Sequence, residues 1–368
     1  MRVIKAGMIG LGGRGKKLSR VINQYCRNLQ VTAVCDLDKE LADTVAAELK
    51  ISEVFYDMDE LLQTDIEAVI LATPIPDHAE HVCRILAAGK HVLSEVHAAT
   101  TIDDCFRIQK AVQDSGKKYM MEENYCYYRP LTIVRNMIEE GLLGDIYYGE
   151  SDYLMDFHLR PGFPDVAGAW RKDTYFGTKG HPYITHSLGP LAFIMNENIT
   201  TVSCMSAGEY PIFEADRMCI LTMKTESGKL IRLRSSFLSP RPNVFTYYSL
   251  QGTKGCYEGK IGPNDTHRIH LREKMENQEW QNVYDFGEYL PKAWDVYPVD
   301  YFDDTVDDCC SKFDSGLPLL VEAFANSIIN DTEPPINVSM ALNWTAAGLL
   351  SDVSARNGGT PIEVPLFK

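Results

Sequence analysis

Short apolar runs alternate with amphipathic segments over the first third of the chain. Strands are predicted at residues 3–9, 31–35, 68–73, 91–93 and 118–121. The segments between them have apolar residues at helical spacing: 14–25, 39–49, 76–89 and 100–116. The run that starts at Ala68 is apolar throughout, as expected of a strand buried on both faces of a sheet. This alternation predicts an α/β architecture with a doubly wound parallel sheet.

The pattern changes after about residue 124. Apolar and polar residues then alternate in runs that turn signals separate, which indicates strands. These runs are 146–153, 200–206, 218–224, 229–237 and 245–251. Helical spacing returns at 130–141, 318–329 and 338–355. The sequence therefore predicts a second, α+β region with a mostly antiparallel sheet.

A glycine-rich motif follows the first predicted strand directly. Residues 10–15 read Gly-Leu-Gly-Gly-Arg-Gly, which has the spacing of a dinucleotide-binding fingerprint. Gly10 permits the tight turn, Gly12 leaves room for a pyrophosphate, and Gly15 lets the helix lie close to the strand. Gly13 and Arg14 lie at the positive helix end that the phosphates would meet. A glycine-rich turn without a ligand is the structural alternative.

The second predicted strand ends at Asp36, twenty-one residues after Gly15. An acid in this place accepts hydrogen bonds from the ribose hydroxyls of the adenosine and repels a 2′-phosphate. Asp36 therefore favours NAD over NADP. Arg14 instead favours NADP, because an arginine there could hold a phosphate.

Charge and composition narrow the class of protein. The net charge of −15 opposes binding to nucleic acid, whose phosphates it would repel. No apolar run approaches the roughly 20 residues of a membrane span. The ten cysteines show no Cys-x-x-Cys pair and no spacing of metal ligands, so we expect neither a disulfide framework nor a metal site. A cytoplasmic protein is the simplest expectation.

Two segments after the third and fourth apolar runs carry a family resemblance. Residues 72–78, Ala-Thr-Pro-Ile-Pro-Asp-His, and 87–95, Ala-Ala-Gly-Lys-His-Val-Leu-Ser-Glu, resemble the glucose–fructose oxidoreductase/inositol dehydrogenase/MocA family. The resemblance covers essentially the whole chain. It implies an NAD-binding Rossmann domain at 1–124 and a substrate and oligomerisation domain at 125–368, with helix 338–357 packed back toward the first. It also implies a carbohydrate substrate, and a homodimer or homotetramer.

The resemblance further implies cofactor contacts from several segments beyond the glycine motif. These residues are Thr73, Pro74, His78, Glu95, Asn124, Trp170 and Arg171. The first two lie at the carboxyl end of a predicted strand, where open α/β sheets bind ligands. His78 could instead be a helix-start histidine without a part in catalysis, and Trp170 could stack on the surface.

One position departs from the family pattern. The family usually reads Glu-Lys-Pro where this chain reads Glu95-Val96-His97, and the lysine is the customary general base. Valine cannot take a proton, so the base comes from elsewhere or the usual reaction is lost. His97 is a possible replacement, although a shift of one residue points a side chain elsewhere on an extended segment.

A second resemblance offers other replacements. Residues 180–190, Gly-His-Pro-Tyr-Ile-Thr-His-Ser-Leu-Gly-Pro, resemble a stretch of the NAD-dependent glycosidases, as do 120–124, Met-Met-Glu-Glu-Asn. It implies that Glu123, Tyr153, Tyr183 and His186 contact the substrate. Histidine suits a base near neutral pH because its unperturbed pKa is about 6.5. We therefore expect His186 to act as the base and Tyr183 to assist.

Each of these residues also has a structural interpretation. His186 could be a satisfied buried histidine, Tyr183 could belong to the core, and Glu123 with Asn124 could hold the hinge between the two regions. On a helix, Tyr183 and His186 would share a face. Because Pro182, Gly189 and Pro190 bound a short stretch, the sequence alone does not decide whether these residues form a helix.

Three functions follow as hypotheses. The first is an NAD-dependent oxidoreductase that transfers a hydride from a secondary alcohol, at C3 of a sugar or glycoside. The second is a redox-neutral glycosidase that uses NAD internally through oxidation, elimination, hydration and reduction. The third is a non-catalytic regulator that binds NAD or sugar.

Overall fold

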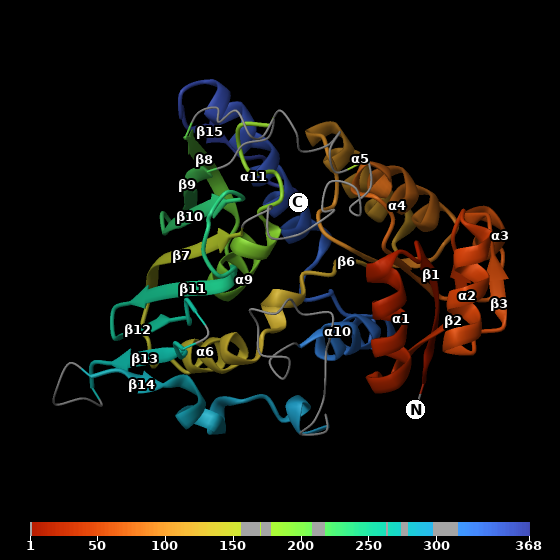
Figure 1. Ribbon diagram of the computed structural model, residues 1–368, viewed down its shortest axis with the longest axis horizontal. Coiled ribbons are helices and arrows are strands. Elements are labelled where there is room, and N and C mark those ends of the chain that lie inside the picture. Colours follow the sequence, from red (N-terminus) through yellow and green to blue (C-terminus); the bar gives the residue numbers. More distant parts are fainter. Residues whose placement is uncertain are drawn as a thin grey trace.

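The computed structural model describes residues 2–155, 170, 178–207, 218–262, 264–273, 279–296 and 316–368. In Figure 1 these residues form two lobes, each built on one sheet. The first sheet has six strands and the second has nine within the described residues.

The first lobe alternates strand and helix as predicted. Its elements are β1 (Ile4–Ile9), α1 (Gly13–Tyr25), β2 (Leu29–Cys35), α2 (Lys39–Leu49), β3 (Glu53–Phe55), α3 (Met58–Leu62), β4 (Ala68–Leu71), η1 (Ile75–Asp77), α4 (His78–Ala87), β5 (His91–Ser94), α5 (Ile102–Ser115) and β6 (Tyr119–Met121). All pairs are parallel, in the order β3-β2-β1-β4-β5-β6. The order reverses between β1 and β4, and ligands bind at such a point.

The second lobe carries the larger sheet. Its strands are β7 (Ile146–Leu154), β8 (Ile199–Ser206), β9 (Met218–Thr225), β10 (Leu230–Ser236), β11 (Val244–Gly252), β12 (Gly255–Glu258), β13 (Arg268–Leu271), β14 (Gln281–Asn282) and β15 (Ile362–Glu363). Only the described pair β7 and β10 is parallel, so the predicted class of a mostly antiparallel sheet is confirmed. In β9 buried and exposed residues alternate strictly, as in a strand with one face on a core.

Helices cover this sheet and link it to the first. They are η2 (Asn124–Tyr127), α6 (Arg129–Glu139), α9 (Thr185–Met195), η4 (Val283–Tyr289), η5 (Lys292–Val296), α10 (Leu317–Ile329) and α11 (Val338–Arg356). α9 packs directly on β7, because a Cβ at Gly149 would lie 2.8 Å from the Cε of Met195.

α10 and α11 lie where the two lobes meet (Figure 1). α10 packs on α1, and α11 contacts both β8 and α5. The hydroxyl of Thr345 on α11 accepts a hydrogen bond of 3.2 Å from the backbone N–H of Ala98, just after β5. The segments after β5 and β6 thus contact elements of the second lobe. Among the described residues, no helix is both long and apolar enough to span a membrane.

Candidate active site

The glycine loop between β1 and α1 has the backbone that its sequence requires. Gly10 has a φ of +89°, in the region that favours glycine, and a Cβ there would lie 2.7 Å from the backbone of Ala72. A Cβ at Gly15 would lie 1.8 Å from the carbonyl oxygen of Gly10. Neither position can carry a side chain without a shift of the loop, so α1 lies as close to β1 as the motif predicts.

The space in front of α1 remains open at Gly12 and Gly13, since no atom lies within 4 Å of where their Cβ atoms would stand. Asp36 lies beside this loop at the end of β2. Its carboxylate accepts the backbone N–H of Leu11 at 2.6 Å and that of Asp38 at 3.0 Å. An open helix N-terminus beside a fixed carboxylate fits the pyrophosphate and ribose of a dinucleotide.

Arg14 turns toward two carboxylates. Its Nη2 donates to Oε2 of Glu122 at 2.7 Å, and its Nε donates to Glu95. Burial raises the pKa of Glu122 well above its ordinary value, and the charge of Glu95 adds to this. Burial would also raise the pKa of Glu95, but the charge of Arg14 and a hydrogen bond from Glu122 lower it to about 2. The two environments therefore favour a neutral Glu122 beside an ionised Glu95.

Sequence analysis did not select Glu122. The signal in the sequence was only that Glu122 directly precedes Glu123 at the end of an apolar run. In the structure Glu122 and Glu123 are both buried.

His78 connects two loops at the carboxyl ends of β4 and β5. Its ring is fully buried, with Nε2 at 2.8 Å from the carbonyl oxygen of Thr73 and Nδ1 at 2.9 Å from that of His97. The hydroxyl of Thr73 lies 3.0 Å from Nδ1 of His81. Both ring contacts of His78 are to backbone, so this histidine orders the loop that includes Pro74.

His97 is also fully buried. Its Nδ1 donates to the carbonyl oxygen of Ala99 at 2.7 Å, and its ring lies 6.2 Å from that of Tyr183, edge-on. Burial and the nearby ring of His78 lower the pKa of His97 to about 3. So weakly basic an imidazole holds a proton poorly near neutral pH, which favours a role in shaping the site over a role as the base.

Three predicted residues form one hydrogen-bonded chain, called here the site triad: Glu123, His186 and Tyr183. Oε1 of Glu123 accepts from Nδ1 of His186 at 2.9 Å, and Nε2 of His186 lies 2.9 Å from the hydroxyl of Tyr183. A carboxylate only accepts, so Nδ1 carries the proton and Nε2 accepts from Tyr183. The Glu123 side chain is fully buried and that of His186 is 12% exposed. The triad thus runs from a buried charge toward a half-buried phenol.

The local sequence explains how His186 is held. It is the second residue of α9, whereas Tyr183 lies before the helix, so the two meet across the helix start rather than along one helical face. In a helix the carbonyl oxygen of His186 would accept a hydrogen bond from the backbone N–H four residues later. That residue is Pro190, which has no N–H. The hydroxyl of Tyr248 on β11 donates to that oxygen instead, at 2.5 Å.

The close packing around α9 also explains why residue 189 is a glycine. A Cβ there would lie 2.9 Å from Cγ of Glu123 and 3.2 Å from the ring of Trp344. The glycine therefore lets the carboxylate of Glu123 pass beneath α9 to reach His186. Its place in the sequence motif follows from this approach, which no local pattern reveals.

Aromatic rings surround the triad. The ring of His186 lies 4.7 Å from that of Tyr125 and stacks on that of Tyr153 at 6.2 Å, with an interplanar angle of 21°. Tyr153 was predicted as a substrate contact, and the structure places its ring against that of His186. Its ring also lies 6.1 Å from that of His181, which sequence analysis did not select.

The remaining predicted residues lie as follows. Asn124 begins η2 and is buried directly after Glu123. Trp170 is half-buried. Arg171 lies outside the described residues. Glu122 contacts Arg14 and the next residue, Glu123, contacts His186, so the acid pair beside the glycine loop and the site triad lie in one region.

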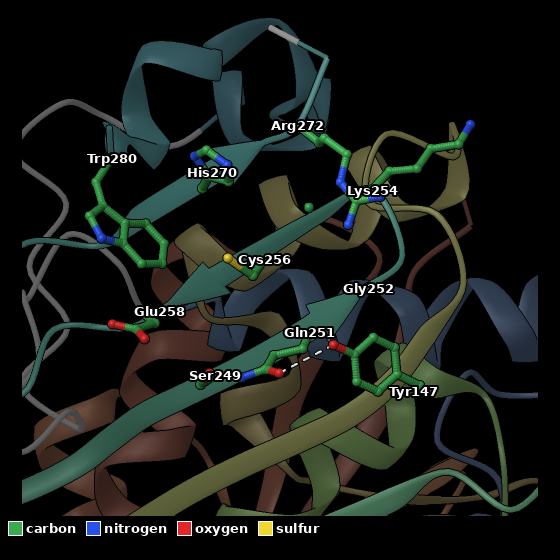
Figure 2. Close-up of a pocket in the computed structure, with 11 residues that line it drawn as sticks. Tyr147, Ser249, Gln251, Gly252, Lys254, Cys256, Glu258, His270, Arg272 and Trp280 are labelled. Carbon is green, nitrogen blue, oxygen red and sulfur yellow. Dashed lines mark hydrogen bonds between the residues drawn. The ribbon is translucent and has the colours of Figure 1, made fainter. Parts of the chain in front are cut away.

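A separate pocket of about 400 Å³ lies over β11, β12 and β13. Figure 2 shows Tyr147 at one side of it and Trp280 at the other, with His270 and Cys256 between them. None of the predicted site residues lines it. The described residues hold no group of three potential metal ligands.

Three family models match the chain. Residues 4–123 match the oxidoreductase family with the NAD-binding Rossmann fold, 132–258 the GFO/IDH/MocA C-terminal domain, and 212–368 the C-terminal domain of glycosyl hydrolase 109. A glycosyl hydrolase family 109 protein of Shewanella pealeana is 30% identical over the whole chain and 86% of its own length. One of Solibacter usitatus is 26% identical over 99% of this chain and 88% of its own.

Solved structures share the fold. Levoglucosan dehydrogenase in complex with NADH has a TM-score of 0.81 at 18% identity and covers 99% of this chain and 100% of its own. The scyllo-inositol dehydrogenase of Lactobacillus casei with NAD(H) and scyllo-inositol has a TM-score of 0.73 at 19% identity. The match covers 98% of this chain and 99% of that protein. The predicted family, fold class, enzyme class and NAD cofactor are confirmed. With an N-terminal NAD-binding Rossmann fold and a glycosyl hydrolase 109 C-terminal domain, this chain belongs to glycosyl hydrolase family 109.

Proposed function

We propose that this protein uses NAD to act on the C3 alcohol of a sugar within a glycoside, and that its net reaction is cleavage of the glycosidic bond. The site triad is the observation that carries the proposal. Val96 stands where the wider family has a basic lysine, and the triad supplies a base from the second lobe instead. Membership of glycosyl hydrolase family 109 favours cleavage over net oxidation.

The residues of the glycine loop fit the cofactor. Gly12 and Gly13 would hold the pyrophosphate at the N-terminus of α1, and Asp36 would hold the ribose hydroxyls. NAD supplies a hydride acceptor that later returns the hydride, so a cleavage reaction consumes no cofactor.

The triad moves the proton. In the resting arrangement Tyr183 donates to Nε2 of His186, and Glu123 accepts from Nδ1. When His186 takes the phenolic proton, the Tyr183 oxygen can take a proton from the sugar. It would first take the C3 hydroxyl proton as the hydride leaves and pass it to solvent, and then take the C2 proton, whose bonding electrons expel the C1 substituent. The imidazolium that forms is stabilised by the buried carboxylate of Glu123. The same path returns the proton later.

Net oxidation of a sugar alcohol is the second candidate. The fold it would need is present, since dehydrogenases of levoglucosan and scyllo-inositol share it over nearly the whole chain. The same triad would then take the hydroxyl proton as the hydride leaves. A homodimer or homotetramer through the nine-stranded sheet accompanies either candidate, because that sheet exposes Ile220 and Leu230.

The test is turnover of p-nitrophenyl glycosides by the purified protein, with and without added NAD, while nitrophenol and NADH are followed together. Release of nitrophenol without growth of NADH supports the cleavage reaction. Growth of NADH without nitrophenol supports net oxidation and contradicts cleavage. Tight binding of NAD without either product would contradict both enzymatic proposals and favour a regulator.

A further inference from the structure

His181 is a buried histidine beside the triad that the proposed mechanism does not use. Its side chain belongs to the segment that leads into α9, and the residue is only 2% exposed. Its Nε2 is inaccessible to solvent and has no hydrogen-bond partner among the described residues. An unpaired polar atom inside a protein destabilises the folded state, and an apolar side chain of similar size would avoid this cost.

The backbone of His181 is fixed on the second lobe. Its N–H donates to Oγ of Ser351 on α11 at 2.9 Å. The preceding Gly180 lies so close to α11 that a Cβ would stand 2.3 Å from the backbone nitrogen of Asp352. The backbone at His181 is therefore fixed against α11.

The ring of His181 lies within the aromatic wall of the site. Its centroid is 5.4 Å from that of Phe237 and 6.1 Å from that of Tyr153, whose other face meets His186. The unpaired atom is thus among the residues that surround the proposed reaction, not in a remote part of the core.

The environment selects a neutral ligand group. Burial lowers the pKa of His181 to about 3, so the imidazole is neutral near pH 7. A neutral imidazole offers one donor and one acceptor. A sugar hydroxyl both donates and accepts, so it can pair with Nε2 whether or not that nitrogen carries the proton, whereas a carboxylate pairs only with a protonated Nε2.

We propose that His181 is a further substrate-binding residue, and that its Nε2 forms a hydrogen bond with a hydroxyl of the bound sugar. This inference rests on the proposed function, since it takes a carbohydrate as the ligand. His181 thereby sets which sugars fit, because a ligand without a hydroxyl at that point leaves the buried nitrogen unpaired.

The experiment compares His181→Leu and His181→Gln with the wild-type protein. Leucine fills the space without polar atoms, whereas the glutamine amide reaches about as far as Nε2. Kinetics are measured on p-nitrophenyl α-N-acetylgalactosaminide, α-galactoside and β-glucoside, and thermal unfolding is measured without sugar. We expect leucine to raise KM at least tenfold, to change kcat less, and to leave the melting temperature unchanged or higher. Glutamine should raise KM less than leucine does, because its amide restores part of the hydrogen bonding.

His267→Gln is the matched control, because His267 is equally buried but has partners on both ring nitrogens. It should lower the melting temperature and leave KM unchanged. An unchanged KM in His181→Leu overturns the inference while the proposed function stands. A lower melting temperature with unchanged KM would also overturn it, by showing that Nε2 has a partner within the chain. If the wild-type protein neither releases nitrophenol nor forms NADH on any glycoside, the proposed function fails, and this inference with it.

Discussion

The second lobe contains two histidines that each meet tyrosine hydroxyls, and only one of them lies in the candidate site. His267 stands between Tyr257, at 2.9 Å from Nδ1, and Tyr128, at 3.3 Å from Nε2. We call these three residues the His267 cluster. His186 has a tyrosine on one nitrogen only, and Glu123 on the other. Residue type and hydrogen-bond lengths are thus nearly the same in the two places.

The difference lies at the two ends of each chain of hydrogen bonds. Burial, with the charge of Lys260, lowers the pKa of His267 to about 3, so this ring stays neutral and joins β12, β13 and the start of α6. His186 has a buried carboxylate behind it and a half-buried phenol in front. A histidine becomes useful for proton transfer when a charge can stabilise its protonated form and a substrate can reach its partner.

The largest expected effect separates the two histidines. His186→Asn keeps an amide donor near Glu123 but removes Nε2, so turnover should fall about 10²- to 10⁴-fold, with the melting temperature almost unchanged. His267→Asn should show the reverse, a lower melting temperature with turnover retained. The measurement is kcat on the best p-nitrophenyl glycoside together with thermal unfolding. A loss of turnover in His267→Asn at full stability would remove the distinction.

Glu123→Gln tests whether the charge behind His186 is what distinguishes the triad. The amide oxygen of glutamine can still accept from Nδ1, so the geometry is kept while the charge is lost. We expect turnover to fall on the order of tenfold to a hundredfold, because the imidazolium is no longer stabilised. Turnover measured against pH should show the loss at every pH. Unchanged turnover would mean that Glu123 only holds the hinge.

The glycine loop and the triad also differ in how far the sequence predicts them. Gly10, Gly15 and Asp36 lie within one βαβ unit, where spacing determines contact, and the structure has each where the motif requires it. Five strands of each sheet followed from apolar patterning for the same local reason. The short strands β3, β12, β13, β14 and β15 and the short helix α3 were not predicted, since segments of two to five residues show little of a period.

The triad required contacts between segments about sixty residues apart in the sequence. Tyr183 and His186 were selected from a resemblance, but nothing local predicts that Glu123 lies behind His186. Nor does any local pattern predict that the hydroxyl of Tyr248 bonds the His186 carbonyl oxygen, which Pro190 leaves without a backbone donor. Long-range partners of this kind depend on how the two lobes pack, which the sequence pattern does not contain.

Tyr248→Phe tests how firmly the helix start must hold His186. The variant loses the hydrogen bond to the His186 carbonyl, which Pro190 cannot replace, and we expect a loss of about 1 kcal/mol in the free energy of unfolding. Turnover should fall by less than tenfold, since the triad itself is intact, and KM should hardly change. Tyr257→Phe is the matched control, because it removes a tyrosine hydroxyl from the His267 cluster. It should cost similar stability and no turnover.

The smallest expected effect is a dependence of stability on pH that comes from the His267 cluster. The pKa of His267 is lowered in the folded state, so the unfolded chain binds a proton more readily. Its contribution is complete above the unfolded pKa of about 6.5 and is lost as the pH falls toward about 3. Between pH 6.5 and 5.5 this loss is about 1 kcal/mol for one such histidine.

His267→Gln should therefore be less stable than the wild-type protein at pH 7 but lose less further stability on acidification. Burial lowers the pKa values of His97 and His181 in the same way, so these histidines also contribute to the pH dependence of stability in the wild-type protein. The variant therefore reduces that dependence without abolishing it. His270→Gln, at a half-buried position of β13, serves as the control and should keep the wild-type slope. Urea unfolding at the two pH values gives the comparison. Equal slopes for wild type and His267→Gln would mean that His267 is protonated within the folded protein, and the contrast with His186 would then rest on Glu123 alone.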